Sequence, residues 1–224
     1  MTSPSPRGSE VQKQDQTESE DMVAPSPARL ESFSDGVIAV VLTIMVLNLR
    51  LPPHDGLNGL REMLPVIAIY LLSFAFTGIY WLNHQRITRR LEAAGYYLQV
   101  ANLAFLFCLS LLPFSTYYLI ARHITPYSVQ QYDATLLLIS AAFYLVRSAV
   151  HTHLRVHHRL TERDRRTRHR HALSLLTYLV CLPLAAWYPH LTVLLLGLDT
   201  AIWALPGLSR HLLATPVATA VQDR

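Results

Sequence analysis

The chain has 224 residues and a formal net charge of +4, with 51% hydrophobic and only 15% charged residues. Soluble domains usually carry about 25% charged residues, so the composition excludes an ordinary soluble domain and indicates one polytopic membrane domain. Both cysteines, Cys108 and Cys181, lie inside apolar runs, which excludes a secreted disulfide scaffold. The isoelectric point is about 9.2, but the basic residues form short stretches between apolar segments, which argues against a nucleic-acid partner.

Both ends of the chain are polar. Residues 1–28 hold four prolines and mixed charges with almost no large apolar side chain. We interpret residues 209–224 in the same way. Such stretches bury too little apolar surface to offset the entropy of ordering. We therefore predict disordered tails at 1–28 and 209–224, on either side of a membrane domain at 29–208.

Six apolar segments follow between the tails. A hydrocarbon core of about 30 Å needs roughly 20 helical residues, and the lack of polar–apolar alternation excludes barrel strands. The segments are Phe33–Leu51, Met63–Leu82, Tyr96–Ile120, Ala134–Val150, Ala172–Tyr188 and Leu191–Leu208. The predicted fold is therefore all-α, with six transmembrane helices.

The arginines predict how these helices are oriented. The connections after the second and fourth segments carry ten arginines, whereas the alternate connections carry three. Because arginine is enriched on the cytoplasmic side, we expect a multi-pass protein of the cell membrane with both termini in the cytoplasm. The arginine- and histidine-rich stretch 151–171 is interpreted as a solvated loop that lies against anionic lipid headgroups.

The first segment begins with an acidic residue. Ser26 can cap the helix and Pro27 suits its first turn, so Asp35 lies more than two turns inside it. An ionised Asp in the apolar region costs up to roughly 3 kcal/mol. Asp35 is thus either a structural or permeation-related carboxylate with a designated partner, or an interfacial acid that reaches the headgroups.

The end of the second segment offers partners for this carboxylate. The short connection between the first two segments makes them antiparallel neighbours, which returns Trp81, Asn83 and His84 to the membrane face where Asp35 lies. Indole, carboxamide and imidazole groups can all donate hydrogen bonds to a carboxylate. Taken singly, Trp81 also suits an aromatic belt and His84 an exposed loop.

Two motifs resemble those of a known family. They are Arg29-x-x-x-Phe33-Ser34-Asp35 at the head of the first helix and Trp81-x-x-His84 at the end of the second. This pair is similar to the transmembrane protein 175 family of potassium channels. The resemblance implies a homotetramer in which four copies of the first helix line a central pore for potassium ions, without a cofactor.

The resemblance also implies which residues line the pore. The family's hydrophobic constriction falls at Val40, the next inward-facing turns at Ile44 and Leu47, and Thr43 forms a polar layer between them. From helical geometry alone, residues 36, 40, 43 or 44, and 47 share one stripe, and ordinary helix packing explains such a stripe equally well. An apolar ring favours potassium because an ion must lose water to cross it and potassium is less strongly hydrated than sodium.

Two further patterns point to other functions. His153-x-x-x-His157 has the spacing of one histidine box of membrane desaturases, but a di-iron site needs several boxes, so we expect neither a metal site nor an enzyme. Arg147 either extends its charged end to the cytoplasmic loop or pairs with Asp199 or Asp35 as a coupled-ion site. The alternative function is therefore a secondary, proton-coupled ion transporter.

Overall fold

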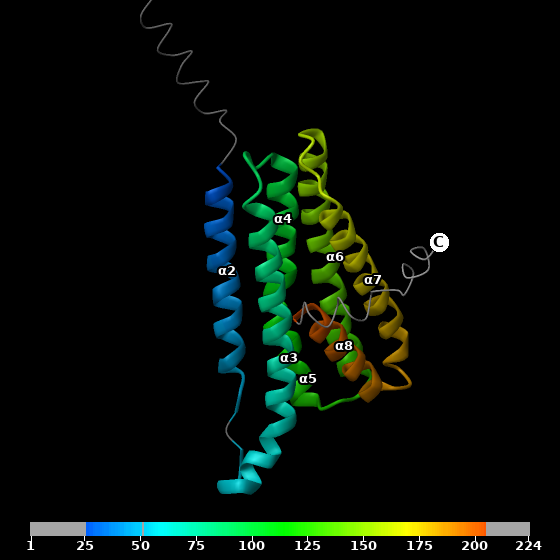
Figure 1. Ribbon diagram of the computed structural model, residues 1–224. Coiled ribbons are helices and arrows are strands. Elements are labelled where there is room, and N and C mark those ends of the chain that lie inside the picture. Colours follow the sequence, from blue (N-terminus) through cyan, green and yellow to red (C-terminus); the bar gives the residue numbers. More distant parts are fainter. Residues whose placement is uncertain (1–25, 51, 205–224) are drawn as a thin grey trace, which may run out of the picture.

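Helices make up almost all of the described residues, 26–50 and 52–204, of the computed structural model (Figure 1). This part of the chain contains no strand, which confirms the predicted all-α class. Its helices are α2 (Pro27–Leu47), α3 (Gly56–Thr88), α4 (Tyr96–Ser110), α5 (Leu112–Arg122), α6 (Pro126–Val156), α7 (Glu162–Leu184) and α8 (Pro189–Ala204).

These helices correspond to the six predicted segments, because α4 and α5 together form one span from Tyr96 to Arg122. The break at Leu111 has a local cause: Pro113 has no N–H to donate to the carbonyl of Leu109. Four spans, namely α2, α3, α4–α5 and α6, are long and apolar enough to cross a membrane. The shorter α8 and the arginine-rich α7 pack against each other and against α6, and they complete a bundle of six helical segments.

Several helices are longer than the apolar segments that predicted them. α3 begins at Gly56 and ends at Thr88, and Figure 1 shows its first turns bent away from the rest, where Pro65 interrupts the hydrogen bonding. α2 begins at Pro27, so the end of the predicted tail 1–28 belongs to the helix. Residues 1–25 and 209–224 of the predicted tails, and 205–208 of the sixth segment, lie outside the described residues.

The stretch 151–171 is the main correction to the predicted elements. It was expected as a loop, but α6 continues to Val156 and α7 already starts at Glu162. Thr161 and Asp164 form a capping box that starts α7, and arginine is a good helix former. The apolar segments mark only the part of these helices that lies in hydrocarbon, whereas the helices themselves extend beyond it.

An aromatic cluster holds the centre of the bundle together. The Tyr80 ring on α3 lies 4.6 Å from Phe76 and 5.0 Å from Phe143 on α6, and Phe143 lies 5.0 Å from Phe105 on α4. All four side chains are buried. In contrast, α2 stands at one edge of the bundle (Figure 1), where it packs on α3, α4 and α5 and leaves its outer side uncovered.

Candidate functional site

The two sides of α2 differ sharply in burial. One face packs into the subunit through Leu30, Ser34, Ile38, Val41 and Met45. The opposite face holds Phe33, Gly36, Val40, Ile44 and Leu47, all of which are exposed. Exposure reaches 54% at Val40 and 79% at Leu47. An apolar helix face of this kind must be covered by lipid or by another protein surface.

A chain of buried polar side chains holds the inner face of α2 to the bundle. Ser34 donates to the carbonyl of Leu30 at 2.8 Å and accepts a hydrogen bond from the Asn102 amide of α4 at 2.9 Å. The carbonyl oxygen of Asn102 in turn accepts from His84 Nε2 of α3 at 2.8 Å. All three side chains are almost fully buried. Since unpaired polar groups are costly in hydrocarbon, these bonds favour one arrangement of α2, α3 and α4.

Asp35 makes a second contact, with α3. Trp81 Nε1 donates to Asp35 Oδ1 at 2.9 Å, and Gln85 Nε2 lies 3.4 Å from Asp35 Oδ2. The other two expected partners bind elsewhere. Asn83 donates to the Ile79 carbonyl of its own helix, and His84 bonds to Asn102. Trp81 and Gln85 are four residues apart and share the side of α3 that faces α2, whereas Asn83 and His84 lie about 160° and 60° from Trp81 around the helix, which explains this division.

The remaining motif residues lie at the surface. Phe33 belongs to the exposed face of α2, and Arg29 is exposed, with no ion pair among the described residues. The neighbouring Glu31 instead pairs with Arg89 at the end of α3, at 3.2 Å. Sequence reasoning missed Asn102, although a lone carboxamide in the apolar run of α4 was the available signal.

The four residues expected to line a pore lie on one face. Val40, Thr43, Ile44 and Leu47 are all exposed in the subunit. The Thr43 hydroxyl donates to the Val40 carbonyl at 2.9 Å, so its donor is satisfied within the helix and its oxygen remains at the surface. This face borders a groove of about 820 Å³, which Phe33, Val40 and Ile44 line together with Phe114 and Tyr117 of α5.

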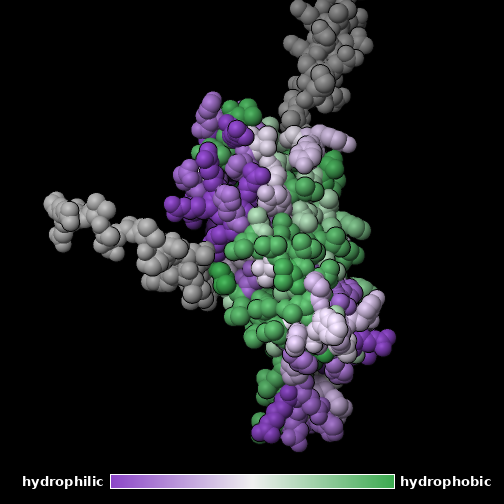
Figure 2. All heavy atoms as spheres, turned by 90° about the vertical axis from the view of Figure 1, so that its right-hand side faces the viewer, coloured by the Kyte–Doolittle hydropathy of each residue, from purple (hydrophilic) through white to green (hydrophobic). Residues whose placement is uncertain are grey.

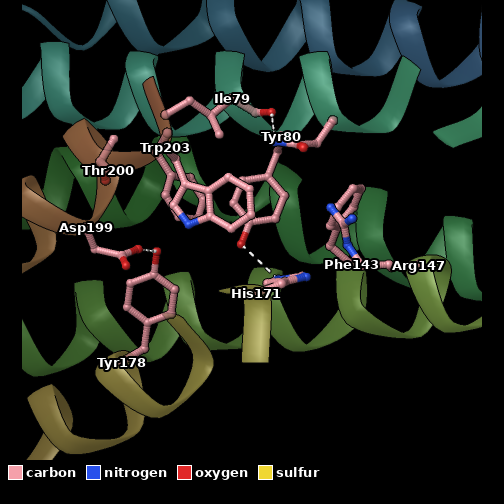
Figure 3. Close-up of a pocket in the computed structure, with 11 residues that line it drawn as sticks. Ile79, Tyr80, Phe143, Arg147, His171, Tyr178, Asp199, Thr200 and Trp203 are labelled. Atoms are coloured by element: carbon pink, nitrogen blue, oxygen red, sulfur yellow. Dashed lines mark hydrogen bonds between the residues drawn. The ribbon is translucent and has the colours of Figure 1, made fainter. Parts of the chain in front are cut away.

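A polar cluster deeper in the subunit contains two of the three residues expected for ion coupling, Arg147 and Asp199 (Figure 3). Asp199 of α8 accepts hydrogen bonds from Tyr178 at 2.7 Å and from Ser174 at 2.8 Å. Arg147 lies on the other side of His171, with its guanidinium 5.3 Å from the Phe143 ring centre. The pairing of Arg147 with Asp199 or Asp35 is therefore wrong for this structure. The cavity among these side chains holds about 20 Å³, room for one water molecule.

The histidine pair forms no recognisable metal centre. The His153 and His157 rings lie 4.5 Å apart at the end of α6. Within residues 26–50 and 52–204, no group of three or more potential ligand side chains could hold a metal ion. Two imidazoles alone fall short of the four ligands of a structural zinc site.

Known proteins identify the family. A model described as "Endosomal/lysosomal potassium channel TMEM175" matches residues 29–113, the part that contains both motifs. A potassium channel of Chryseobacterium sp. strain P1-3 is 30% identical over 178 residues, which are 80% of this chain and 92% of that protein. The chain belongs to the TMEM175 family. A potassium channel of Streptomyces collinus is 35% identical over 92 residues, 39% of this chain and 45% of that protein.

A solved structure has the same fold. The crystal structure of a lysosomal potassium-selective channel TMEM175 homologue from Chamaesiphon minutus superposes with a TM-score of 0.71 at 23% identity, over 80% of this chain and 97% of the other. Together, the family model and the Chryseobacterium relative confirm the expected family. TMEM175 proteins form a family of multi-pass membrane channels rather than enzymes.

Proposed function

We propose that this TMEM175 chain is the subunit of a homotetrameric, potassium-permeable channel in which four copies of α2 surround the conduction path. The observation that carries the proposal is the division of α2 into an anchored inner face and an uncovered apolar outer face. The names of the Chryseobacterium and Streptomyces relatives support potassium as the permeant ion. The potassium ion and the surrounding lipid would be its partners, and no cofactor is needed.

The constriction would form where the exposed face of α2 meets its symmetry copies. Val40, Ile44 and Leu47 would supply apolar rings, and the Thr43 oxygen a polar layer between them. Ions cross such rings only after partial loss of water, and an empty apolar ring closes by dewetting. Potassium loses water more readily than sodium, so the arrangement would favour potassium without a cage of backbone carbonyls.

The motif would act by fixing the rotation of α2. Ser34 and Asp35 are adjacent residues, about 100° apart around the helix, and they bind different helices: Ser34 binds α4, whereas Asp35 binds α3. At the far end, Asn48 Nδ2 donates to the Pro113 carbonyl at 3.2 Å. Held at both ends, α2 would keep its apolar face turned away from its own subunit.

The orientation in the membrane is part of the proposal. The start of α2, the end of α3 and the junction of α6 and α7 lie at the same end of the bundle (Figure 1). The arginine-rich connections belong to this end, so the positive-inside rule supports cytoplasmic termini. The proposed location is the cell membrane.

Flux measurements distinguish this channel from a proton-coupled transporter. Purified protein in liposomes should pass potassium down its gradient at the same rate whether or not a protonophore clamps the proton gradient. Protein-free liposomes should show no potassium flux. Potassium flux that disappears without a proton gradient would favour the transporter. A chicken relative, 24% identical over 133 residues, is named a proton channel. The same liposome assay should therefore also measure proton flux in the absence of potassium.

Substitutions test the assignment of the pore face. Asn at Val40, Ile44 or Leu47 should raise conductance and weaken the discrimination between potassium and sodium, because a polar ring holds water. Asn at Leu42 or Val46, each of which lies about 160° away from Ile44 around α2, serves as the control. Equal losses of selectivity at both sets would show that another face lines the pore.

A further inference from the structure

The first turns of α7 carry an unusual density of positive charge. Five arginines fall between Glu162 and His171, and two of them are engaged within the subunit. Arg168 Nε donates to the Tyr144 hydroxyl at 3.1 Å, and the Arg170 guanidinium lies 4.5 Å from the Trp203 ring centre. The other three, Arg163, Arg165 and Arg166, are exposed. We call these three residues the basic face of α7.

The basic face has little neutralising charge around it. Arg165 lies 3.6 Å from Glu162, in a pair exposed to solvent on both sides. Asp164, the other acid of this turn, is already bound to Arg90 at 2.5 Å. Among the described residues, Arg163 and Arg166 make no ion pair. An exposed pair of this kind contributes little, so an anion from outside the subunit finds at least two uncompensated guanidinium groups.

The basic face continues an exposed apolar stripe of the same helix. Leu173, Leu176 and Val180 are each more than half exposed and follow one another at spacings of three and four. Arg166 and His169 continue this spacing toward the start of α7, so they lie on the same stripe. Figure 2 shows hydrophilic residues gathered over the upper part of this side of the molecule and a hydrophobic band below them.

The height of the arginines above the hydrocarbon fits the headgroup layer. Arg166 precedes Leu173 by seven residues, a rise of about 10 Å along the helix. The headgroup region adds roughly 5–8 Å to each side of the hydrocarbon core, and arginine side chains reach along a surface to place their charge. In a bilayer whose hydrocarbon begins near Leu173, the guanidinium groups would therefore reach the level of the lipid phosphates.

The start of α7 is also held in place. The Thr161–Asp164 capping box fixes the first turn, and Arg90, just after the end of α3, bridges to Asp164 and to the Arg159 carbonyl at 2.9 Å. We propose that the basic face of α7 is a binding site for the phosphate headgroups of anionic phospholipids in the adjacent leaflet. Charge complementarity and continuity with the exposed apolar stripe favour membrane lipid as the occupant. The site does not depend on the proposed pore.

Native mass spectrometry of the detergent-solubilised protein tests the site. Phosphatidylglycerol and phosphatidylcholine with the same acyl chains serve as probes, and the protein should retain phosphatidylglycerol preferentially. The test variant carries Arg163→Gln, Arg165→Gln and Arg166→Gln. Since a basic residue at an anionic surface contributes roughly fivefold to binding, the preference should fall at least tenfold. An unchanged preference would overturn the proposal.

The opposite end of the bundle supplies the matched control. Replacing Arg50, Arg61 and Arg122 by Gln removes the same charge from residues that are also exposed, and this variant should keep the preference. An equal loss in both variants would mean that only net charge matters and would overturn the site.

Two measurements on the unmodified protein keep the test decisive if the triple variant fails to fold. The preference for phosphatidylglycerol should decline as salt screens the guanidinium groups. Inorganic phosphate at the same concentration should fail to displace the lipid, because the stripe below the site also binds acyl chains. A salt-independent preference, or full displacement by phosphate, would overturn the assignment to membrane lipid.

Discussion

Removing the Asn102 side chain tests whether the buried polar chain holds α2 in place. Asn102→Ala deletes the 2.8 Å bond to His84 and the 2.9 Å bond to Ser34. Ser34 keeps its bond to the Leu30 carbonyl, whereas His84 keeps no side-chain partner among the described residues, since its Nδ1 is already unpaired. Asn102→Ala therefore leaves mainly the His84 imidazole of α3 without a hydrogen-bond partner.

The size of the effect follows from the two lost bonds. A side-chain hydrogen bond between membrane helices contributes about 0.6 kcal/mol on average and up to about 1.7 kcal/mol. Asn102→Ala should thus lower the free energy of unfolding by about 1–3 kcal/mol, which corresponds to a fall of roughly 3–10 °C in the melting temperature of a protein of this size.

Thermal unfolding of the purified protein, followed by the size-exclusion profile after heating, measures this change. Asn83→Ala is the control, because among residues 26–50 and 52–204 the Asn83 side chain bonds only to the Ile79 carbonyl of its own helix. A double-mutant cycle with His84→Ala separates the network from local packing: the two substitutions should be less than additive. Equal shifts for Asn102→Ala and Asn83→Ala, or strictly additive effects, would refute the network.

Three other changes give distinct outcomes. A Cβ on Gly59 would overlap the His54 carbonyl oxygen, so Gly59→Ala should lower the melting temperature. A Cβ on Gly78 meets no atom of the described residues within 4 Å, so Gly78→Ala should be neutral or stabilising by up to about 1 kcal/mol. Partial burial raises the pKa of Asp164, but hydrogen bonds from Thr161 and the charge of Arg90 outweigh this effect and hold the pKa below its usual range. Asp164→Asn should therefore lower the free energy of unfolding at neutral pH. The difference between the variant and the unmodified protein should disappear as the pH falls below about 4 and Asp164 becomes protonated. Trp81→Phe removes the donor to Asp35 and should reduce selectivity and melting temperature together, whereas Trp187→Phe, an exposed site, should change neither.

The pairing of the first two helices was predictable, whereas the role of α4 was not. A short connection dictates that α2 and α3 run antiparallel, and this alone returns Trp81 to the level of Asp35. The bond from Asn102 to Ser34 joins residues 68 positions apart. No local pattern reveals which polar residue of a distant apolar helix will face α2, because that depends on the rotation of both helices in the assembled bundle.

The arginine-rich stretch shows a different limit. Apolar windows find the part of a helix that lies in hydrocarbon, so the charged turns of α7 were assigned to a loop. The signals for a helix were present in the same residues: Thr161 and Asp164 have the spacing of a capping box, and arginine favours helix. Capping chemistry therefore locates the ends of such helices better than hydropathy does.

The position of Asp35 favours a structural role over a direct role in permeation. Asp35 precedes Val40 by five residues, which places the two side chains about 140° apart around α2. The carboxylate faces α3, where Trp81 binds it, and not the exposed face that would line the pore. If this carboxylate attracted ions, Asp35→Asn would reduce conductance while Trp81→Phe would not. If it orients α2, both changes break the same contact, and the double variant should be no less selective than either single one.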